Sequence, residues 1–79
     1  MSITVGLHEF LVARTKRSWE ADEDLFAGGV VSSLFALELV VYLEKAHGVE
    51  VEGEYLSIDN FRTINNIEQM VTELQAAAS

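Results

Sequence analysis

Apolar side chains recur at the three- and four-residue spacing of an amphipathic helix along three stretches of this chain. The spacing predicts helices over residues 3–16, over residues 33–46 and from Thr63 to about residue 74. The expected inward stripes are Ile3, Leu7, Phe10, Leu11 and Arg14 on the first helix; Leu34, Leu37, Val40, Val41 and Leu43 on the second; and Ile64, Ile67, Met70, Val71 and Leu74 on the last.

The first connection, residues 17–31, is longer than most loops of compact domains. A loop of this length needs apolar side chains of its own to hold it against the core. We expect Trp19, Leu25 and Phe26 to serve that purpose.

The second connection begins with alternating valine and glutamate over residues 49–55, a pattern typical of a strand. Since no partner strand occurs elsewhere, we interpret it as an extended segment that turns Val49 and Val51 inward. A short helix is predicted over residues 56–61, with Ile58 and Phe61 inward. The predicted fold class is an all-α bundle of three main helices and one short helix, formed by residues 1–79 as a single domain.

A serine pair stands where the first connection becomes the second helix. Ser32 fits the N-cap position, and Ser33 fits the first helical position. The free N–H groups and the positive end of the helix dipole favour an anion there, so Ser33 suits a phosphate ester. Most serines at this position act only as caps, and that alternative stays open on the local pattern alone. The other helix ends have signals at Ser2 or Thr4, at His47 and Gly48, and at Thr63.

The formal net charge is −8, and it is uneven along the chain. From Ser18 onward, twelve acidic residues face only Lys45 and Arg62, which leaves −10. Such a surface repels nucleic acid and anionic membranes, and it attracts a basic patch on a protein partner. The sequence contains no cysteine, no basic and apolar leader, and no apolar stretch long enough to span a bilayer. We therefore expect a soluble, cytoplasmic monomer.

The residues near each candidate in the sequence argue against several functions. His8 has no second metal ligand nearby, and the acidic loop lacks the ligand spacing of a calcium site. His47 lies a helix length from Ser33 and cannot act as its base, which argues against a serine hydrolase. A helix-turn-helix protein would read DNA with the second helix. That helix carries Glu38 and Glu44 but a single basic residue, Lys45, which argues against DNA binding.

From about Asp24 to Leu74, the chain resembles the acyl carrier protein family. The signature of that family is Asp-Ser-Leu at the start of the second helix, followed by a Glu-Leu pair. The residues that carry the resemblance are Ser32, Ser33 and Leu34, then Glu38 and Leu39, then Glu44, together with Phe61, Arg62, Thr63 and Ile64 before the last helix.

The resemblance implies that Ser33 is esterified by 4′-phosphopantetheine taken from coenzyme A and that the terminal thiol of this arm holds an acyl group as a thioester. It also implies a carrier without catalytic activity of its own. Its expected partners are a phosphopantetheinyl transferase, an acyl-loading enzyme and downstream synthase or tailoring enzymes. We expect them to bind at Ser32, Leu34, Phe35, Glu38, Val41 and Glu44.

Two positions depart from the family pattern. Ser32 replaces the usual aspartate, which keeps the cap but removes a charge, and it leaves modification of Ser32 itself as an alternative. Phe35 is apolar on what we expect to be the exposed side of the helix, so partner preference is expected to be unusual.

The cargo is suggested by similarity alone. Asp24-Leu25-Phe26 and Asp59-Asn60-Phe61-Arg62-Thr63 resemble discrete carriers of polyketide pathways, which hold glyceryl, hydroxymalonyl or methoxymalonyl units. A fatty-acid carrier and an aminoacyl or peptidyl carrier remain open, as does an unmodified helical interaction module.

Overall fold

The computed structural model describes residues 3–78, and it is helical throughout, without a strand in that range. The elements are α1 (Ile3–Thr15), α2 (Ser33–His47), the single 3₁₀ turn η1 (Gly53–Tyr55), α3 (Ile58–Phe61) and α4 (Ile64–Ala78). The all-α class and the three long helices are confirmed, each predicted boundary lying within a few residues of the observed one. The 3₁₀ turn was not predicted.

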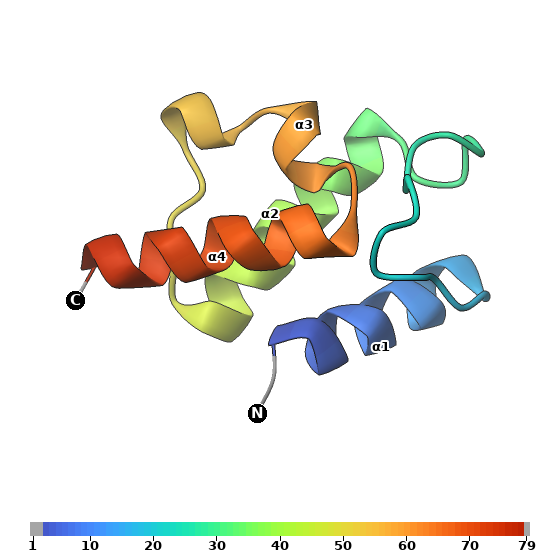
Figure 1. The fold of residues 1–79 in the computed structure, drawn as a ribbon, viewed down its shortest axis with the longest axis horizontal. Helices are drawn as coiled ribbons and strands as arrows, with labels where there is room; N and C mark the ends of the chain where they lie inside the picture. The colour runs from blue at the N-terminus through green and yellow to red at the C-terminus, as the bar shows by residue number, and fades with distance from the viewer. Residues whose placement is uncertain (1–2, 79) are drawn as a thin grey trace.

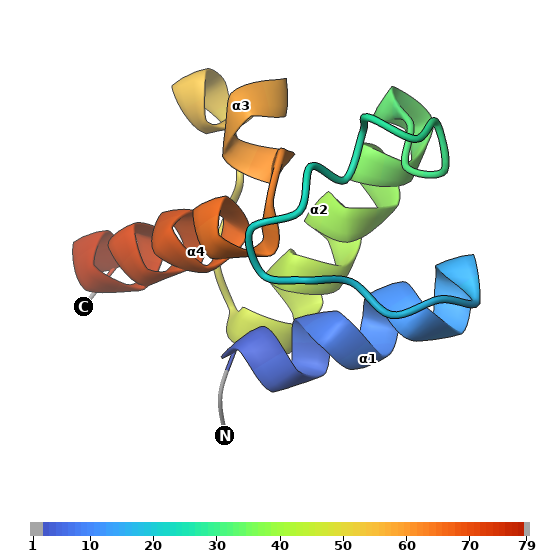
Figure 2. The same cartoon turned by 45° about the vertical axis from the view of Figure 1, so that its right-hand side comes forward.

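The helix α4 contacts α1, α2 and α3, so it is the element around which the others pack. Figure 1 shows α4 in front of α2, with α1 below and α3 above. In Figure 2 the long connection between α1 and α2 runs across the face of the bundle near α2. Across residues 3–78, every helix falls short of the length and apolar character that a membrane crossing requires.

The predicted stripe of α4 is confirmed. Ile64, Ile67, Met70 and Val71 are at most 2% exposed, and Leu74 packs against them while partly buried. Thr63 caps the helix as expected, because its Oγ1 accepts a hydrogen bond of 3.1 Å from the Asn66 N–H. The core is completed by Leu7, Leu11, Trp19, Leu25, Val31, Leu39, Leu43, Val49, Val51 and Phe61.

The buried face of α2 differs in part from the predicted one. Leu43 is fully buried and Val40 packs partly buried against the core, as predicted. Leu34, Leu37 and Val41 are instead 74%, 59% and 51% exposed, and Leu39, which was not predicted, is fully buried. Since Glu38 is the only charged residue between positions 34 and 43, apolar spacing fits more than one face of this helix. The contacts with α3 and α4 select the face that carries Leu39 and Leu43.

Three further side chains lie on the opposite side from the predicted one. Phe35, expected to be exposed, is partly buried against Phe10, with the ring centroids 6.0 Å apart. Ile58, expected to be buried, is 47% exposed. Arg14 leaves the core stripe of α1 and reaches Glu38 on α2. In each case the position relative to a neighbouring helix decides the burial, and helical spacing within one segment does not contain that information.

The long connection is held as predicted. Trp19 and Leu25 are buried and Phe26 is partly buried. The Trp19 indole N–H donates to Thr15 Oγ1 over 2.9 Å, and the guanidinium of Arg17 stacks 3.7 Å above the indole ring. The Leu25 N–H donates to the Arg62 carbonyl over 2.7 Å and so ties the loop to the start of α4.

The predicted end of α2 is confirmed, whereas the predicted start of α1 at Thr4 is not. Thr4 lies inside α1, and Ser2, the other predicted cap, lies outside the described residues. Gly48 ends α2 as predicted, with φ 66° and its N–H bonded to the Glu44 carbonyl at 3.1 Å. The extended segment then buries Val49 and Val51, which are 5% and 4% exposed.

At the end of α1, Lys16 occupies the left-handed region with φ 64°. A residue with a Cβ is strained there by about 1 kcal/mol, while glycine is not. We expect Lys16→Gly to raise the free energy of unfolding by about 0.5–1 kcal/mol, part of the gain being offset by the greater freedom of glycine in the unfolded chain. Urea denaturation followed by Trp19 fluorescence measures the change. Lys16→Ala is the control because it keeps the Cβ, and equal stability of the two variants would contradict this account.

Candidate functional site

Ser33 is the first residue of α2 and is exposed. Ser32 caps the helix as predicted: its backbone is extended (φ −113°, ψ 175°), and its Oγ accepts a hydrogen bond of 3.3 Å from the Phe35 N–H. The Ser32 carbonyl accepts the first helical bond, from Ala36 N–H, at 2.9 Å. The cap therefore uses the Ser32 hydroxyl and leaves the Ser33 hydroxyl facing solvent at the positive end of the helix dipole.

An apolar groove of about 190 Å³ opens beside Ser33, between α2 and α3. Its lining contains no charged side chain, and it exposes Leu37 of α2 together with Leu56 and Ile58 of the opposite wall. The complete lining is Ser33, Ala36, Leu37, Val40, Leu56, Ser57, Ile58 and Phe61. The sequence reasoning missed this groove because it placed Leu37 and Ile58 in the core; the available signal was that α2 has more apolar residues than one buried face requires.

The two carboxylates of α2 do not gather around Ser33. Glu38 forms an ion pair with Arg14 of α1. Glu44 is partly buried, and its Oε2 accepts a hydrogen bond of 3.1 Å from the Val51 N–H. Both groups therefore have partners within the chain, and the expectation that they bind a partner protein stays a prediction.

Of the remaining predicted binding residues, Leu34 and Val41 lie exposed on α2, and Phe35 faces α1. Phe10 also stacks on Tyr42, with ring centroids 4.4 Å apart. Burial, and then the nearby Glu9 carboxylate, raise the pKa of the Tyr42 hydroxyl above its usual range. These rings join α1 to α2 and do not contribute to the surface beside Ser33.

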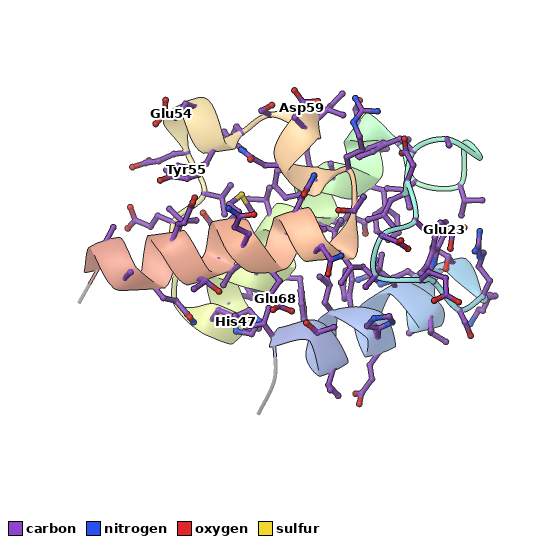
Figure 3. The ribbon with its side chains drawn as sticks, viewed as in Figure 1. Glu23, His47, Glu54, Tyr55, Asp59 and Glu68 are labelled. Carbon is purple, nitrogen blue, oxygen red and sulfur yellow. The ribbon has the colours of Figure 1, made fainter. Side chains whose placement is uncertain are left out.

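Among residues 3–78, the Ser33 hydroxyl forms no hydrogen bond to a base. His47 is the last residue of α2, about 21 Å along the helix from Ser33 at 1.5 Å per residue. Figure 3 shows it at the lower end of that helix, close to α1. Its Nε2 is buried without a hydrogen-bond partner among the described residues. Within residues 3–78, no cluster of three metal-ligating side chains is present.

The site therefore consists of an exposed serine at a helix start, an uncharged groove next to it, and no catalytic group within reach. This arrangement fits the class of small helical carriers, in which a serine at a helix start is modified and presented to other proteins.

No family model and no solved structure match the chain. Among curated proteins, it is similar to the D-alanyl carrier proteins of Streptococcus pyogenes serotype M5 (strain Manfredo), serotype M49 (strain NZ131) and serotype M1. Each is 43% identical over 56 residues, which cover 71% of this chain and 71% of the relative. The chain belongs to the acyl carrier protein family.

Proteins of this family carry 4′-phosphopantetheine covalently, and they hold acyl groups without catalytic activity of their own. The residues present fit such a group. Ser33 offers an exposed hydroxyl where an anion is favoured, and the groove beside it can cover the apolar part of a flexible arm. The expected resemblance, the carrier class and the prosthetic group are confirmed, while the relatives give no support to a polyketide context.

Proposed function

We propose that Ser33 is the attachment residue and that this chain is a free-standing carrier of an acyl thioester. The observation that carries the proposal is the position of Ser33: it is exposed, it is the first residue of α2, and its neighbour Ser32 supplies the cap. A modification at Ser32 would remove the hydroxyl that holds the helix start. A modification at Ser33 leaves the cap in place.

In the transfer, the Ser33 oxygen forms a bond to the phosphorus that carries the pantetheine of coenzyme A. The pyrophosphate bond breaks, adenosine 3′,5′-bisphosphate leaves, and the serine proton passes to a base of the transferase. The bound group supplies the thiol that this cysteine-free chain lacks. The chain contributes the exposed hydroxyl, the positive end of α2 beside the phosphate and the uncharged groove.

The partners implied are the phosphopantetheinyl transferase, an enzyme that loads the acyl group and an enzyme that consumes it. We propose that the protein acts with them in the cytoplasm as a monomer. The acidic composition and the absence of cysteine support that location.

For the cargo, we propose a glyceryl unit of the kind that polyketide pathways load. The groove beside Ser33 supports this uncharged member of the group, because its lining offers no charged partner to the carboxylate of a malonyl unit or to the ammonium of an aminoacyl unit. A D-alanyl group is the second candidate, since the relatives are named for it. Its ammonium would then stay in solvent outside the groove.

The test of the carrier role is intact-protein mass spectrometry after incubation with coenzyme A, magnesium and a broad-specificity phosphopantetheinyl transferase. We expect a mass gain of one phosphopantetheine, which peptide mapping assigns to Ser33. The absence of any gain, with two different transferases that modify a control carrier, would contradict the carrier role and favour the unmodified interaction module.

The cargo is tested on the modified protein. It is offered D-alanine with ATP and a D-alanine-activating ligase in one reaction, and a glyceryl-loading enzyme with its activated three-carbon acid in the other. We expect loading in the second reaction. Loading only in the first would replace the proposed cargo by D-alanine and leave the carrier role intact.

A further inference from the structure

Ser57 supplies the second hydroxyl of the groove beside Ser33. Among the described residues that line this groove, Ser33 on α2 and Ser57 at the start of α3 are the ones with polar side chains. The others are apolar: Ala36, Leu37, Val40, Leu56, Ile58 and Phe61. A group that enters the groove from Ser33 therefore meets one polar side chain in the described lining, that of Ser57.

The hydrogen-bonding groups of Ser57 are all used except the hydroxyl proton. Its N–H donates to the Tyr55 carbonyl over 2.9 Å, and its carbonyl accepts from the Asn60 N–H over 3.0 Å. Its Oγ caps α3 by accepting from the Asp59 N–H over 3.3 Å. A hydroxyl also has one proton to donate, and no acceptor among residues 3–78 takes that of Ser57. This proton can therefore bond to a ligand in the groove.

The position of Ser57 is fixed before any ligand arrives. The turn that leads into it is closed by a hydrogen bond of 3.1 Å from the Leu56 N–H to the Gly53 carbonyl. On either side of Ser57, the side chains of Leu56 and Ile58 are 52% and 47% exposed and form an apolar wall of the groove. A ligand that packs on this wall meets a hydroxyl already held in place, so little ordering is needed to form the bond.

Phosphopantetheine has the chemistry that this lining can bind. Beyond the phosphate, the arm carries a carbon with two methyl groups and then a chain with two amides, whose carbonyls accept hydrogen bonds. The groove extends along α2 from Ser33 to Val40, about 10 Å at 1.5 Å per residue. That length takes in the methyl groups and the amide nearer to Ser33. The apolar side chains match the methyl groups, and an amide carbonyl in apolar surroundings needs the donor that Ser57 offers.

We infer that Ser57 binds the arm: its hydroxyl donates a hydrogen bond to an amide carbonyl of the phosphopantetheine on Ser33, while Leu37 and Ile58 cover the methyl groups. This role rests on the proposed function, because it requires the arm at Ser33. A neutral hydrogen bond that replaces one to water contributes modestly, about fivefold in the ratio of held to free arm. The arm thus rests along the groove between encounters and is released readily to a partner enzyme.

The test compares the unmodified and the phosphopantetheine-bearing forms of isotope-labelled protein by NMR, for the wild type and two variants. Ser57→Gly removes the hydroxyl, and glycine is tolerated at an N-cap at little cost. Ser57→Thr keeps both the cap and the donor. Subtracting the two forms of one variant cancels any effect of the substitution on α3 itself, and the melting temperatures of the unmodified forms show whether the fold is kept.

In the wild type, modification is expected to shift the amide resonances of α3 around Ile58 as well as those next to Ser33. The methyl groups of the arm should show nuclear Overhauser contacts to Leu37 and Ile58. Ser57→Gly is expected to lower the ratio of held to free arm about fivefold, so the α3 shifts shrink while those next to Ser33 persist. Ser57→Thr should retain the wild-type shifts.

Equal α3 shifts in the wild type and in Ser57→Gly would overturn the role of Ser57. Wild-type shifts confined to the residues next to Ser33 would overturn it too, as would a Ser57→Thr protein that behaves like Ser57→Gly. All three results leave the modification at Ser33 intact. Failure of the transferase to modify the wild-type protein would instead contradict the proposed function.

Discussion

A Ser33→Ala variant is expected to fold like the wild-type protein and to accept no phosphopantetheine from coenzyme A. The loss should be complete, because the substitution removes the oxygen that forms the bond to phosphorus. The fold should persist because Ser33 is exposed and its side chain makes no hydrogen bond to the described residues, while alanine is favourable within a helix. Intact mass after incubation with the transferase measures the first outcome, and thermal unfolding measures the second.

Ser32→Ala is the matched control for this variant. It removes the hydroxyl that caps α2, so we expect the free energy of unfolding to fall by about 1 kcal/mol while modification at Ser33 continues. The two variants thus separate the cap from the attachment residue. A mass gain in Ser33→Ala that is lost in Ser32→Ala would move the assignment to Ser32.

Leu39→Ala is expected to have the largest effect on stability among the substitutions considered. Leu39 is fully buried on α2, and removing such a side chain costs about 2–5 kcal/mol through lost burial and the cavity that remains. At roughly 0.05–0.15 kcal/mol per residue, a chain of 79 residues has a total stability of only about 4–12 kcal/mol. The variant should therefore lose a large fraction of the total stability, and its urea midpoint should fall clearly.

The control is Leu34→Ala on the same helix, which makes the same chemical change at a side chain that is 74% exposed. Its effect on the free energy of unfolding is expected to stay within about 0.5 kcal/mol. Urea denaturation followed by circular dichroism and by the fluorescence of buried Trp19 gives both values. Similar losses in the two variants would mean that the buried face of α2 has been assigned incorrectly.

The contrast between α4 and α2 shows what apolar spacing can predict. In α4, polar side chains such as Asn65, Asn66 and Gln69 separate the apolar positions, so only one face could be buried, and the prediction was correct. In α2, Glu38 is the only charged residue from position 34 to 43, so the spacing was compatible with several faces. The prediction was correct for Leu43 and Val40 but wrong for Leu34, Leu37 and Val41, which are exposed.

The candidate site likewise combines features that the local sequence predicts with features that it does not. The cap at Ser32, the place of Ser33 as the first residue of the helix and the end of α2 at Gly48 depend on residues close in sequence, and the sequence predicted them. The partners of the Glu38 and Glu44 carboxylates lie on other segments of the chain. Glu38 forms an ion pair with Arg14 on α1, and Glu44 accepts a hydrogen bond from the segment after the helix. Net charge alone therefore did not predict that these carboxylates have partners within the chain.

The sequence by itself determined the helical class, the three long helices, the buried stripe of α4 and the serine at the start of α2, because hydrophobic period and capping are local properties. Only the tertiary structure decided which face of α2 is buried, where the groove beside Ser33 opens and which ion pairs form between elements. Those features depend on how α1, α3 and α4 pack against α2. Packing between helices is set by contacts between residues far apart in the chain, which a local pattern does not contain.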